Sequence, residues 1–207
     1  IKKLLLNNKL GKLIGANIYS GEYLPNFHKY EDYRKSYAAN KRLGGGVVLS
    51  VIHEIDLCVY FFGKPTSVFS VGGKSSNLDI DVEDYSNSIV CFNNKENNRL
   101  PISITLDYLQ NPSIKTIKIV GNIATLHWDY NKSYLSINYH DGSKKKIVKK
   151  IKNFQRDSMF IEEIKYFFSC IKKNQQPILN FNEALKSLNI ALSIKESMRR
   201  NKIIKFQ

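Results

Sequence analysis

The chain has 207 residues, of which 43% are hydrophobic and 24% charged, a composition typical of a globular protein with one good core. No apolar run approaches the length of a membrane span, and no signal-peptide pattern opens the sequence, so no membrane partner is expected. The formal net charge of +14 would suit a nucleic-acid-binding protein.

The distribution of the basic residues argues against nucleic acid as the partner. The lysines are dispersed along the chain, and the one dense cluster, KKKIVKKIK at 144–152, fits the exposed end of a hairpin. No recognition motif accompanies the charge. Three widely spaced cysteines in apolar surroundings form no CxxC pair, which predicts neither a disulfide framework nor zinc and favours the cytoplasm. No pair of histidines with a carboxylate has metal-ligand spacing, so we expect no metal.

The first predicted elements are the last turns of a helix, within residues 1–12, and a strand at about 13–19. The chain starts inside an element and without methionine, which is what we expect of a fragment of something longer. A polar, aromatic segment, SGEYLPNFHKYEDYRKSYAANKR, follows the strand. It is too long for a simple connection, and long irregular loops in compact domains are usually functional.

Three glycines at 44–46 lead into an apolar segment whose spacing predicts a helix over about 47–62. Gly63 and Pro65 mark its end. From 66 to about 150 the hydrophobic period changes to two, and six segments separated by Asn, Gly and Pro read as strands. The short links between them, including a hairpin turn at Asp141-Gly142, predict antiparallel pairing.

Two helices close the chain, over 157–173 and 180–200, the second with Asn182 as its expected cap. The elements together predict an α+β fold, a large and mostly antiparallel open β-sheet with helices packed on one face. We expect residues 1–207 to form a single domain.

The predicted helix at 47–62 carries the candidate chemistry. If it is continuous, Ser50 and His53 lie one turn apart on one face, close to the glycines. Each signal by itself has an ordinary structural explanation. A single histidine on an apolar helix is commonly a hydrogen-bonded core residue, and glycines can simply allow close approach of the backbone.

The order of the motifs resembles the substrate domain of the Gfo/Idh/MocA family of NAD(P)-dependent oxidoreductases. The resemblance covers nearly the whole chain. Its residues are Asp32-Tyr33-Arg34, Tyr37, Gly44-Gly45-Gly46, His53, Glu54, Asp56 and Phe62-Gly63-Lys64-Pro65, with DVEDYSNSIVCF, IKIVGNIATLHWDY and DSMFIEEIKYFFSCI further on.

The resemblance implies a substrate-binding and oligomerisation domain of the dihydrodipicolinate-reductase-like, or glyceraldehyde-phosphate-dehydrogenase-like C-terminal, type. The family's N-terminal Rossmann domain has a glycine-rich loop and a catalytic lysine in a Glu-Lys-Pro motif. This chain has neither GxGxxG nor Glu-Lys-Pro. Residues 1–12 then correspond to the end of the helix that links from that domain, which would bind NAD or NADP and hold most or all of the cofactor site.

The resemblance also implies roles for particular residues. His53 would accept or donate the proton that accompanies hydride transfer, as an imidazole can at neutral pH. Ser50 would hydrogen-bond the substrate or the imidazole, where many members of the family have aspartate. The other implied substrate-binding residues are Asn26, His28, Tyr33, Arg34 and Tyr37.

The implied function is oxidation or reduction of a sugar, nucleotide-sugar or cyclitol at a hydroxyl or ketone, with homo-oligomers formed through the free sheet face. The chain by itself would be inactive. An alternative, suggested by Ser50, is a non-catalytic binding or oligomerisation module of the same fold. A basic nucleic-acid-binding protein remains the third hypothesis.

Overall fold

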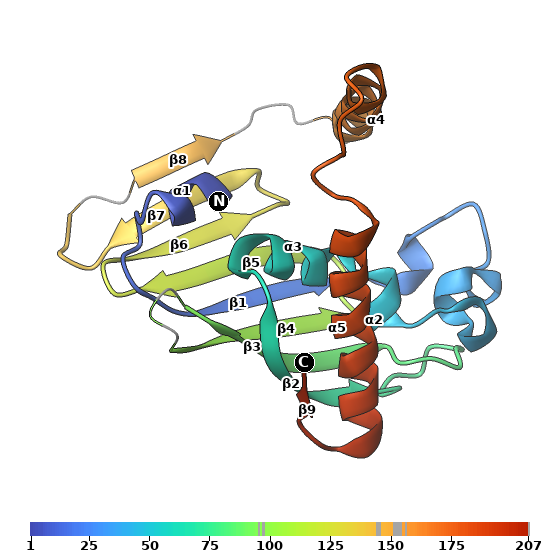
Figure 1. Ribbon diagram of the computed structural model, residues 1–207. Helices are drawn as coiled ribbons and strands as arrows, with labels where there is room; N and C mark the ends of the chain where they lie inside the picture. The colour runs from blue at the N-terminus through green and yellow to red at the C-terminus, as the bar shows by residue number, and fades with distance from the viewer. Residues whose placement is uncertain (95, 97, 144–145, 151–154, 156, 207) are drawn as a thin grey trace.

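The computed structural model describes residues 1–94, 96, 98–143, 146–150, 155 and 157–206, and of 146–150 the backbone only. Nine strands form one sheet in the order β8-β7-β6-β5-β1-β4-β3-β2-β9 (Figure 1). The strands are β1 (Leu13–Gly21), β2 (Pro65–Gly73), β3 (Tyr85–Asn93), β4 (Arg99–Asp107), β5 (Ile114–Gly121), β6 (Ala124–Asp129), β7 (Tyr134–Tyr139), β8 (Lys146–Lys150) and β9 (Ile204–Lys205).

The sheet is mixed, because β1 and β4 at its centre run parallel while every other neighbouring pair is antiparallel. Alternation along the strands divides the side chains between two faces. Ile18 of β1 pairs with Ile104 of β4 and with Ile117 of β5, and all three are completely buried beneath the helices. Tyr19, the next residue, lies on the opposite face.

The helices seen in Figure 1 lie on one side of the sheet, and the longest of them crosses β2. This helix, α5, buries an apolar stripe that includes Ile190, Ala191 and Ile194. Full burial of each isoleucine side chain contributes about 1.5–3 kcal/mol. The helices are α1 (Lys2–Leu6), α2 (Val47–Ser50), α3 (His53–Phe62), α4 (Asp157–Lys172) and α5 (Phe181–Arg200).

The predicted α+β architecture, a large and mostly antiparallel sheet with helices on one face, is confirmed. Gly63 ends α3 with φ +88°, as the sequence predicted. The expected cap at Asn182 is wrong, because Asn180 caps α5 and its side chain accepts a hydrogen bond from the Glu183 backbone N–H. The predicted basic cluster at 144–152 falls largely outside the described residues, which include only the backbone of 146–150.

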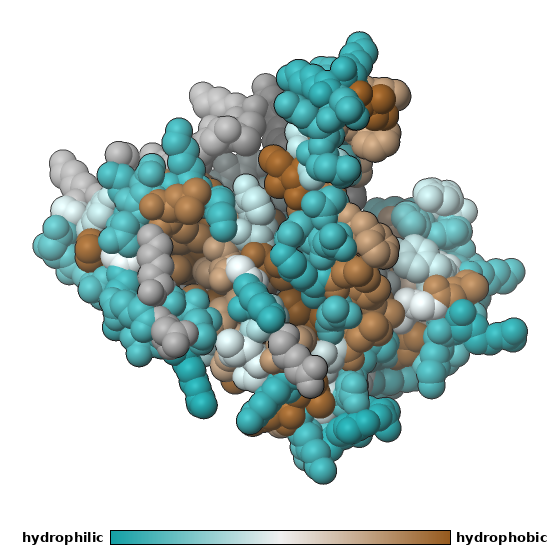
Figure 2. Space-filling model, in the orientation of Figure 1, coloured by the Kyte–Doolittle hydropathy of each residue, from teal (hydrophilic) through white to brown (hydrophobic). Residues whose placement is uncertain are grey.

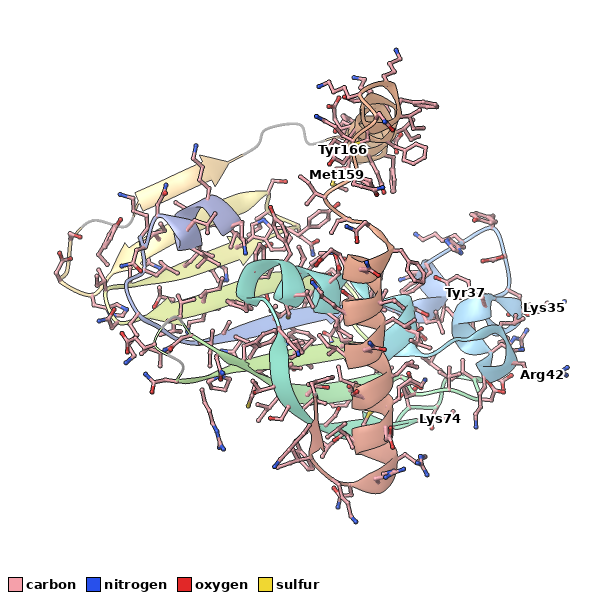
Figure 3. All side chains as sticks on the ribbon, viewed as in Figure 1. Lys35, Tyr37, Arg42, Lys74, Met159 and Tyr166 are labelled. Carbon is pink, nitrogen blue, oxygen red and sulfur yellow. The ribbon has the colours of Figure 1, made fainter. Side chains whose placement is uncertain are left out.

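Helix α4 stands away from the sheet and exposes large apolar side chains (Figures 1 and 2). Met159 and Tyr166, labelled in Figure 3, are each 43% exposed, and Phe167 and Phe168 are each 56% exposed. Cys170 is the one buried residue of this helix. Exposed apolar patches of this kind are commonly interaction surfaces.

The predicted helix over 47–62 is divided in two. Val51, with φ −109° and ψ 28°, ends α2, and His53 begins α3. The two halves are bent by 47° at the break. The Glu54 backbone N–H donates to the Val51 carbonyl, a three-residue turn in place of the four-residue spacing of an α-helix. Ser50 and His53 therefore lie on separate helices.

Among the described residues, no single helix is both long and apolar enough to cross a membrane. The one combination that passes on length and composition is the bent pair 41–50 and 53–62.

Candidate active site

The aromatic segment forms a cluster of short 3₁₀ helices, η1 (Leu24–Asn26), η2 (Tyr33–Lys35), η3 (Tyr37–Ala39) and η4 (Lys41–Leu43), at one end of the sheet. Figure 3 shows Lys35, Tyr37 and Arg42 there, with Lys74 from the loop after β2. Tyr108, which follows β4, anchors the cluster. Its ring packs edge-on against Phe27, and its hydroxyl donates to the Ala38 carbonyl at 3.3 Å.

Gly45 allows this cluster to pack against the start of α2. A Cβ at Gly45 would overlap the backbone carbonyl oxygens of Tyr37 and Ala38. At Gly44, φ is +79° but nothing lies within 4 Å of the position that a Cβ would occupy, so only backbone strain opposes a side chain.

The two glycines make a matched test. Gly44→Ala is expected to lower the free energy of unfolding by about 1–2 kcal/mol, the cost of a left-handed residue with a Cβ. Gly45→Ala is expected to cost more, because the backbone of η3 must move away. Chemical denaturation of both variants measures the difference, and an equal loss in the two would contradict the close approach described above.

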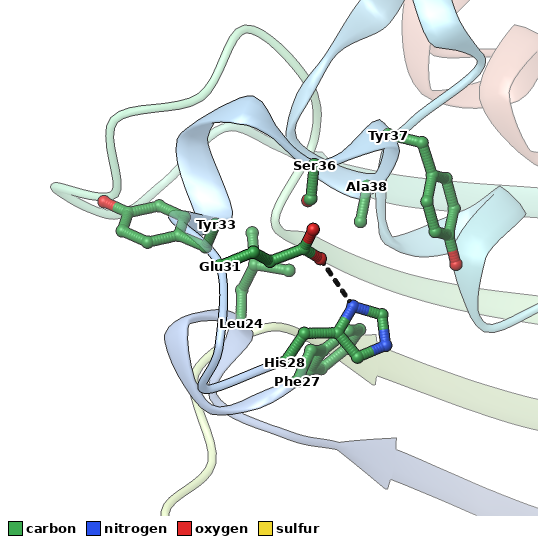
Figure 4. A pocket seen from close by; sticks show the side chains of 8 residues that line it. All are labelled: Leu24, Phe27, His28, Glu31, Tyr33, Ser36, Tyr37 and Ala38. Atoms are coloured by element: carbon green, nitrogen blue, oxygen red, sulfur yellow. Dashed lines mark hydrogen bonds and ion pairs between the residues drawn. The ribbon is translucent and has the colours of Figure 1, made fainter.

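Three of the predicted substrate-binding residues come together. His28, Tyr33 and Tyr37 line a cavity of about 10 Å³, together with Glu31 and Ser36 (Figure 4). His28 Nδ1 lies 2.7 Å from Glu31 Oε1. The cavity has room for about one water molecule and is too small for a sugar. The Ser36 hydroxyl is buried and forms no hydrogen bond with a described residue.

Arg34 and Asn26 do not line this cavity. Arg34 donates from Nε and Nη2 to the carboxylate of Asp32 at 2.8–3.1 Å. These hydrogen bonds hold the pKa of Asp32 below its ordinary value. Because Nε and Nη2 already bind Asp32, the N–H groups of Nη1 are the ones that Arg34 could offer to an anionic substrate.

Ser50 lies beside Tyr108. Burial raises the pKa of the Tyr108 hydroxyl, and the nearby Ser50 hydroxyl partly opposes that effect. Ser50 Oγ itself is buried and has no well-formed hydrogen bond to any described residue. A buried hydroxyl with unused capacity is where a water or a ligand hydroxyl would bind.

His53 stands over a buried ion pair. Its side chain is 56% exposed, while the neighbouring Glu54 is completely buried. His53 Nε2 lies 3.0 Å from Glu54 Oε1, and Lys115 Nζ lies 2.6 Å from the same oxygen. Lys115 is on β5 and also lies 5.4 Å from the centre of the Tyr130 ring. The sequence interpretation included His53 but neither Glu54 nor Lys115 as a member of the site.

The pKa of Glu54 reflects opposing effects. Burial would raise it, but the contact with His53 and the positive charge of Lys115 outweigh burial, so the pKa lies below its ordinary value. Glu54 is therefore an anion at neutral pH. The contacts are electrostatic, because neither Glu54 oxygen has a well-aligned hydrogen bond to a described residue.

A hydrogen bond from α5 helps to hold α3 in place. The Ser187 hydroxyl donates to Asp56 Oδ1 at 2.7 Å. Near the start of α2, Lys195 of α5 donates to both oxygens of Glu83 at 2.7–2.8 Å, and the Val47 N–H donates to the Glu83 carbonyl. Contacts from α5 therefore reach α3 directly through Asp56, and the Glu83 contacts fix the start of α2 next to it.

These residues include a titratable imidazole and buried hydroxyls, and the described part of the chain contains no recognisable cofactor site. The chain has no glycine-rich dinucleotide loop, and the described residues contain no group of three or more His, Cys, Asp or Glu side chains arranged for a metal. A nicotinamide cofactor would have to be held mainly by another domain.

Solved structures with the same fold are dehydrogenases and oxidoreductases. Levoglucosan dehydrogenase in its apo form has a TM-score of 0.81 at 15% identity, covering 100% of this chain and 62% of its own. Aldose-aldose oxidoreductase from Caulobacter crescentus, complexed with glycerol, has a TM-score of 0.80 at 19% identity. The match covers 99% of this chain and 58% of that structure's chain. The WlbA dehydrogenase from Bordetella pertussis, in complex with NADH and UDP-GlcNAcA, has a TM-score of 0.73 at 17% identity. The match covers 100% of this chain and 59% of that structure's chain.

At these identities the likeness shows the fold, and the chain spans about three fifths of the length of these structures. No curated protein matches the chain. A family model described as the oxidoreductase family, C-terminal alpha/beta domain, matches residues 2–206. The resemblance inferred from the sequence is thereby confirmed, and the chain belongs to the Gfo/Idh/MocA oxidoreductase family, whose C-terminal domain it matches.

Proposed function

We propose that this domain is the substrate-binding part of an NAD(P)-dependent oxidoreductase that acts on a hydroxyl or ketone of a sugar, nucleotide sugar or cyclitol. The observation that carries the proposal is the exposed imidazole of His53 beside the completely buried, ionised Glu54 and its ion-pair partner, the partly buried Lys115. In the oxidation direction His53 takes the hydroxyl proton, and in reduction it returns one. A bound nicotinamide would supply the hydride chemistry.

Buried polar groups of this domain that lack hydrogen-bond partners fit a polyhydroxylated ligand. Among the described side chains, Ser36, Ser50 and Glu54 are three of the four residues that have buried polar atoms without a well-formed hydrogen bond. Ser36 and Ser50 are both close to the aromatic cluster. We assign Ser50, Asn26, His28, Tyr33, Arg34 and Tyr37 to substrate binding, with the cluster moving or exchanging partners as the substrate enters.

The cofactor and the rest of the site belong to a nucleotide-binding domain. The matched structures have about two fifths of their chains outside the region that this chain covers. Some of them were solved with NADH and a sugar-type ligand, levoglucosan in one and UDP-GlcNAcA in another. The exposed apolar side chains of α4 supply a surface on which such a domain could pack.

We further propose that the 207 residues form one domain that also assembles copies of the protein, in a reducing compartment such as the cytoplasm. The sheet face opposite the helices carries an apolar area in which Val71 is 51% and Ile89 is 47% exposed. This face is the proposed contact between copies. Sedimentation measures the oligomeric state of the protein, and a strictly monomeric protein would rule out this contact.

The function is tested by a turnover assay. The polypeptide that joins this domain to a nucleotide-binding domain is incubated with NAD or NADP and a panel of sugars, nucleotide sugars and cyclitols, while formation of reduced nicotinamide is recorded. We expect turnover with at least one polyol class. Saturable binding of these ligands without any turnover would favour the non-catalytic module instead.

A further inference from the structure

The buried ion pair beneath His53 determines which of its ring nitrogens can accept a proton. Nε2 lies 3.0 Å from Glu54 Oε1. An ionised carboxylate is an acceptor only, so an unprotonated Nε2 would place its lone pair close to an anionic oxygen, which is electrostatically unfavourable. A protonated Nε2 instead places its N–H dipole favourably toward that charge, even though the N–H is not aimed straight at the oxygen.

Lys115 stabilises the contact between His53 and the charged Glu54. Its Nζ lies 2.6 Å from the same Glu54 oxygen and keeps that carboxylate charged within the protein. Lys115 also lies against the Tyr130 ring, so its ammonium group is held on two sides. Glu54 follows His53 in the first turn of α3, and its completely buried carboxylate is held beside the ring by the contact with Lys115.

The second ring nitrogen of His53, Nδ1, is available to bind a ligand. His53 is 56% exposed, although Nε2 is directed toward a completely buried group. Among the described residues, His53 Nδ1 has no hydrogen-bond partner. The tautomer of a histidine follows from the hydrogen-bonding group at one ring nitrogen and decides what the other can do.

We propose that Glu54, paired with Lys115, is a positioning residue that holds neutral His53 in the Nε2-protonated form, so that Nδ1 is the nitrogen that exchanges a proton with the substrate. This inference rests on the proposed function for its catalytic meaning. In the oxidation direction Nδ1 would take the substrate hydroxyl proton as the C=O bond forms, and a nicotinamide held by another domain would supply the hydride acceptor. The imidazolium then releases a proton to solvent.

The tautomer is measured by NMR on protein labelled with ¹⁵N-histidine, using correlations between the ring protons and both ring nitrogens. His53→Gln identifies the His53 signals among those of the four histidines. We expect neutral His53 in the wild type to show a protonated Nε2 and an unprotonated Nδ1. Glu54→Gln, which replaces the anion by a neutral amide, is expected to shift the His53 nitrogens toward a tautomer mixture.

A matched control is available at His28. Glu31 contacts His28 through Nδ1 at 2.7 Å, so Glu31→Gln also removes a carboxylate from a histidine but should leave the His53 signals unchanged. A protonated Nδ1 on neutral wild-type His53 would overturn the proposal, and so would His53 signals that do not respond to Glu54→Gln. If Glu54→Gln does not fold, the wild-type tautomer alone decides.

An activity measurement tests the positioning role. In the two-domain polypeptide, Glu54→Gln is expected to lower kcat roughly tenfold or more with little change in KM, as loss of an orienting partner does. An unchanged kcat would overturn that role. The tautomer is measured without substrate or cofactor. The tautomer proposal can therefore be contradicted while the proposed function holds, and the proposed function can be contradicted while the tautomer proposal holds.

Discussion

Replacing His53 with alanine in the two-domain polypeptide is expected to lower kcat by about 10²–10⁴-fold, the usual cost of losing a general base. The physical reason is that, in the proposed site, this domain transfers the proton and the nucleotide-binding domain holds the cofactor. The residues of this chain handle the proton, and His53 is the exposed titratable group held over a fixed anion. Without it, the hydroxyl proton would have to leave to water as the hydride departs.

The measurement compares steady-state kcat and KM of the variant and the wild type. His140→Ala is the control, because His140 is exposed at the end of β7 and its ring hydrogen-bonds only the Thr125 hydroxyl among the described residues. That variant should keep wild-type turnover. A His53→Ala protein that turns over as fast as the control would exclude His53 as the proton carrier and point toward Ser50 or a group of the other domain.

Most of the architecture could be predicted from local patterns. The change from a period of about four to a period of two at Pro65, and back at Asp157, follows directly from which side chains must face the core. The parallel β1–β4 pair at the centre could not be predicted in this way. It joins strands separated by about 80 residues of chain, and alternation within a strand carries no information about its partner.

The break between α2 and α3 had no local signal. Val51 and Ile52 are neither glycine nor proline, and the apolar spacing continues through them. The break accompanies tertiary contacts on both sides, where the Glu83 carbonyl binds the start of α2 and Ser187 binds Asp56 of α3. Tertiary contacts of this kind commonly override helix propensity.

Half of the site beneath His53 could have been suspected from sequence. Glu54 is a carboxylate in an otherwise apolar helix, and charges are rarely buried without a partner. Its partner could not be identified, because Lys115 is one of many lysines and reaches Glu54 only through the pairing of β5 with β1. The sequence also predicts a functional role for the aromatic cluster, but it could not identify its anchor, Tyr108, which follows β4 far along the chain.

Replacing Lys115 with methionine is expected to lower the free energy of unfolding by about 3–5 kcal/mol at neutral pH, the usual cost of leaving a buried charge without its partner. Methionine retains the length of the lysine stem, so little packing is lost. Glu54 would remain completely buried with only His53 nearby. Chemical denaturation of the domain measures the loss.

The effect should depend on pH with a definite sign. The folded-state pKa of Glu54 is below its ordinary value, so its ion pair contributes stability above the unfolded carboxyl pKa of about 4.3 and loses it as the pH falls through the folded value. In Lys115→Met, burial is opposed by less positive charge, and the pKa of Glu54 rises. The difference in stability between wild type and variant should therefore be largest near neutrality and shrink below about pH 4.

Two further variants separate this charge effect from simple damage to β5. Lys118→Met changes an exposed lysine on the same strand and should stay within about 0.5 kcal/mol of the wild type. Glu54→Gln in the Lys115→Met background removes the stranded anion, so the double variant should be more stable than Lys115→Met alone, with a coupling free energy of about 2 kcal/mol or more. Strictly additive losses would mean that Lys115 supports the fold by packing, and that the charge on Glu54 has another source of compensation.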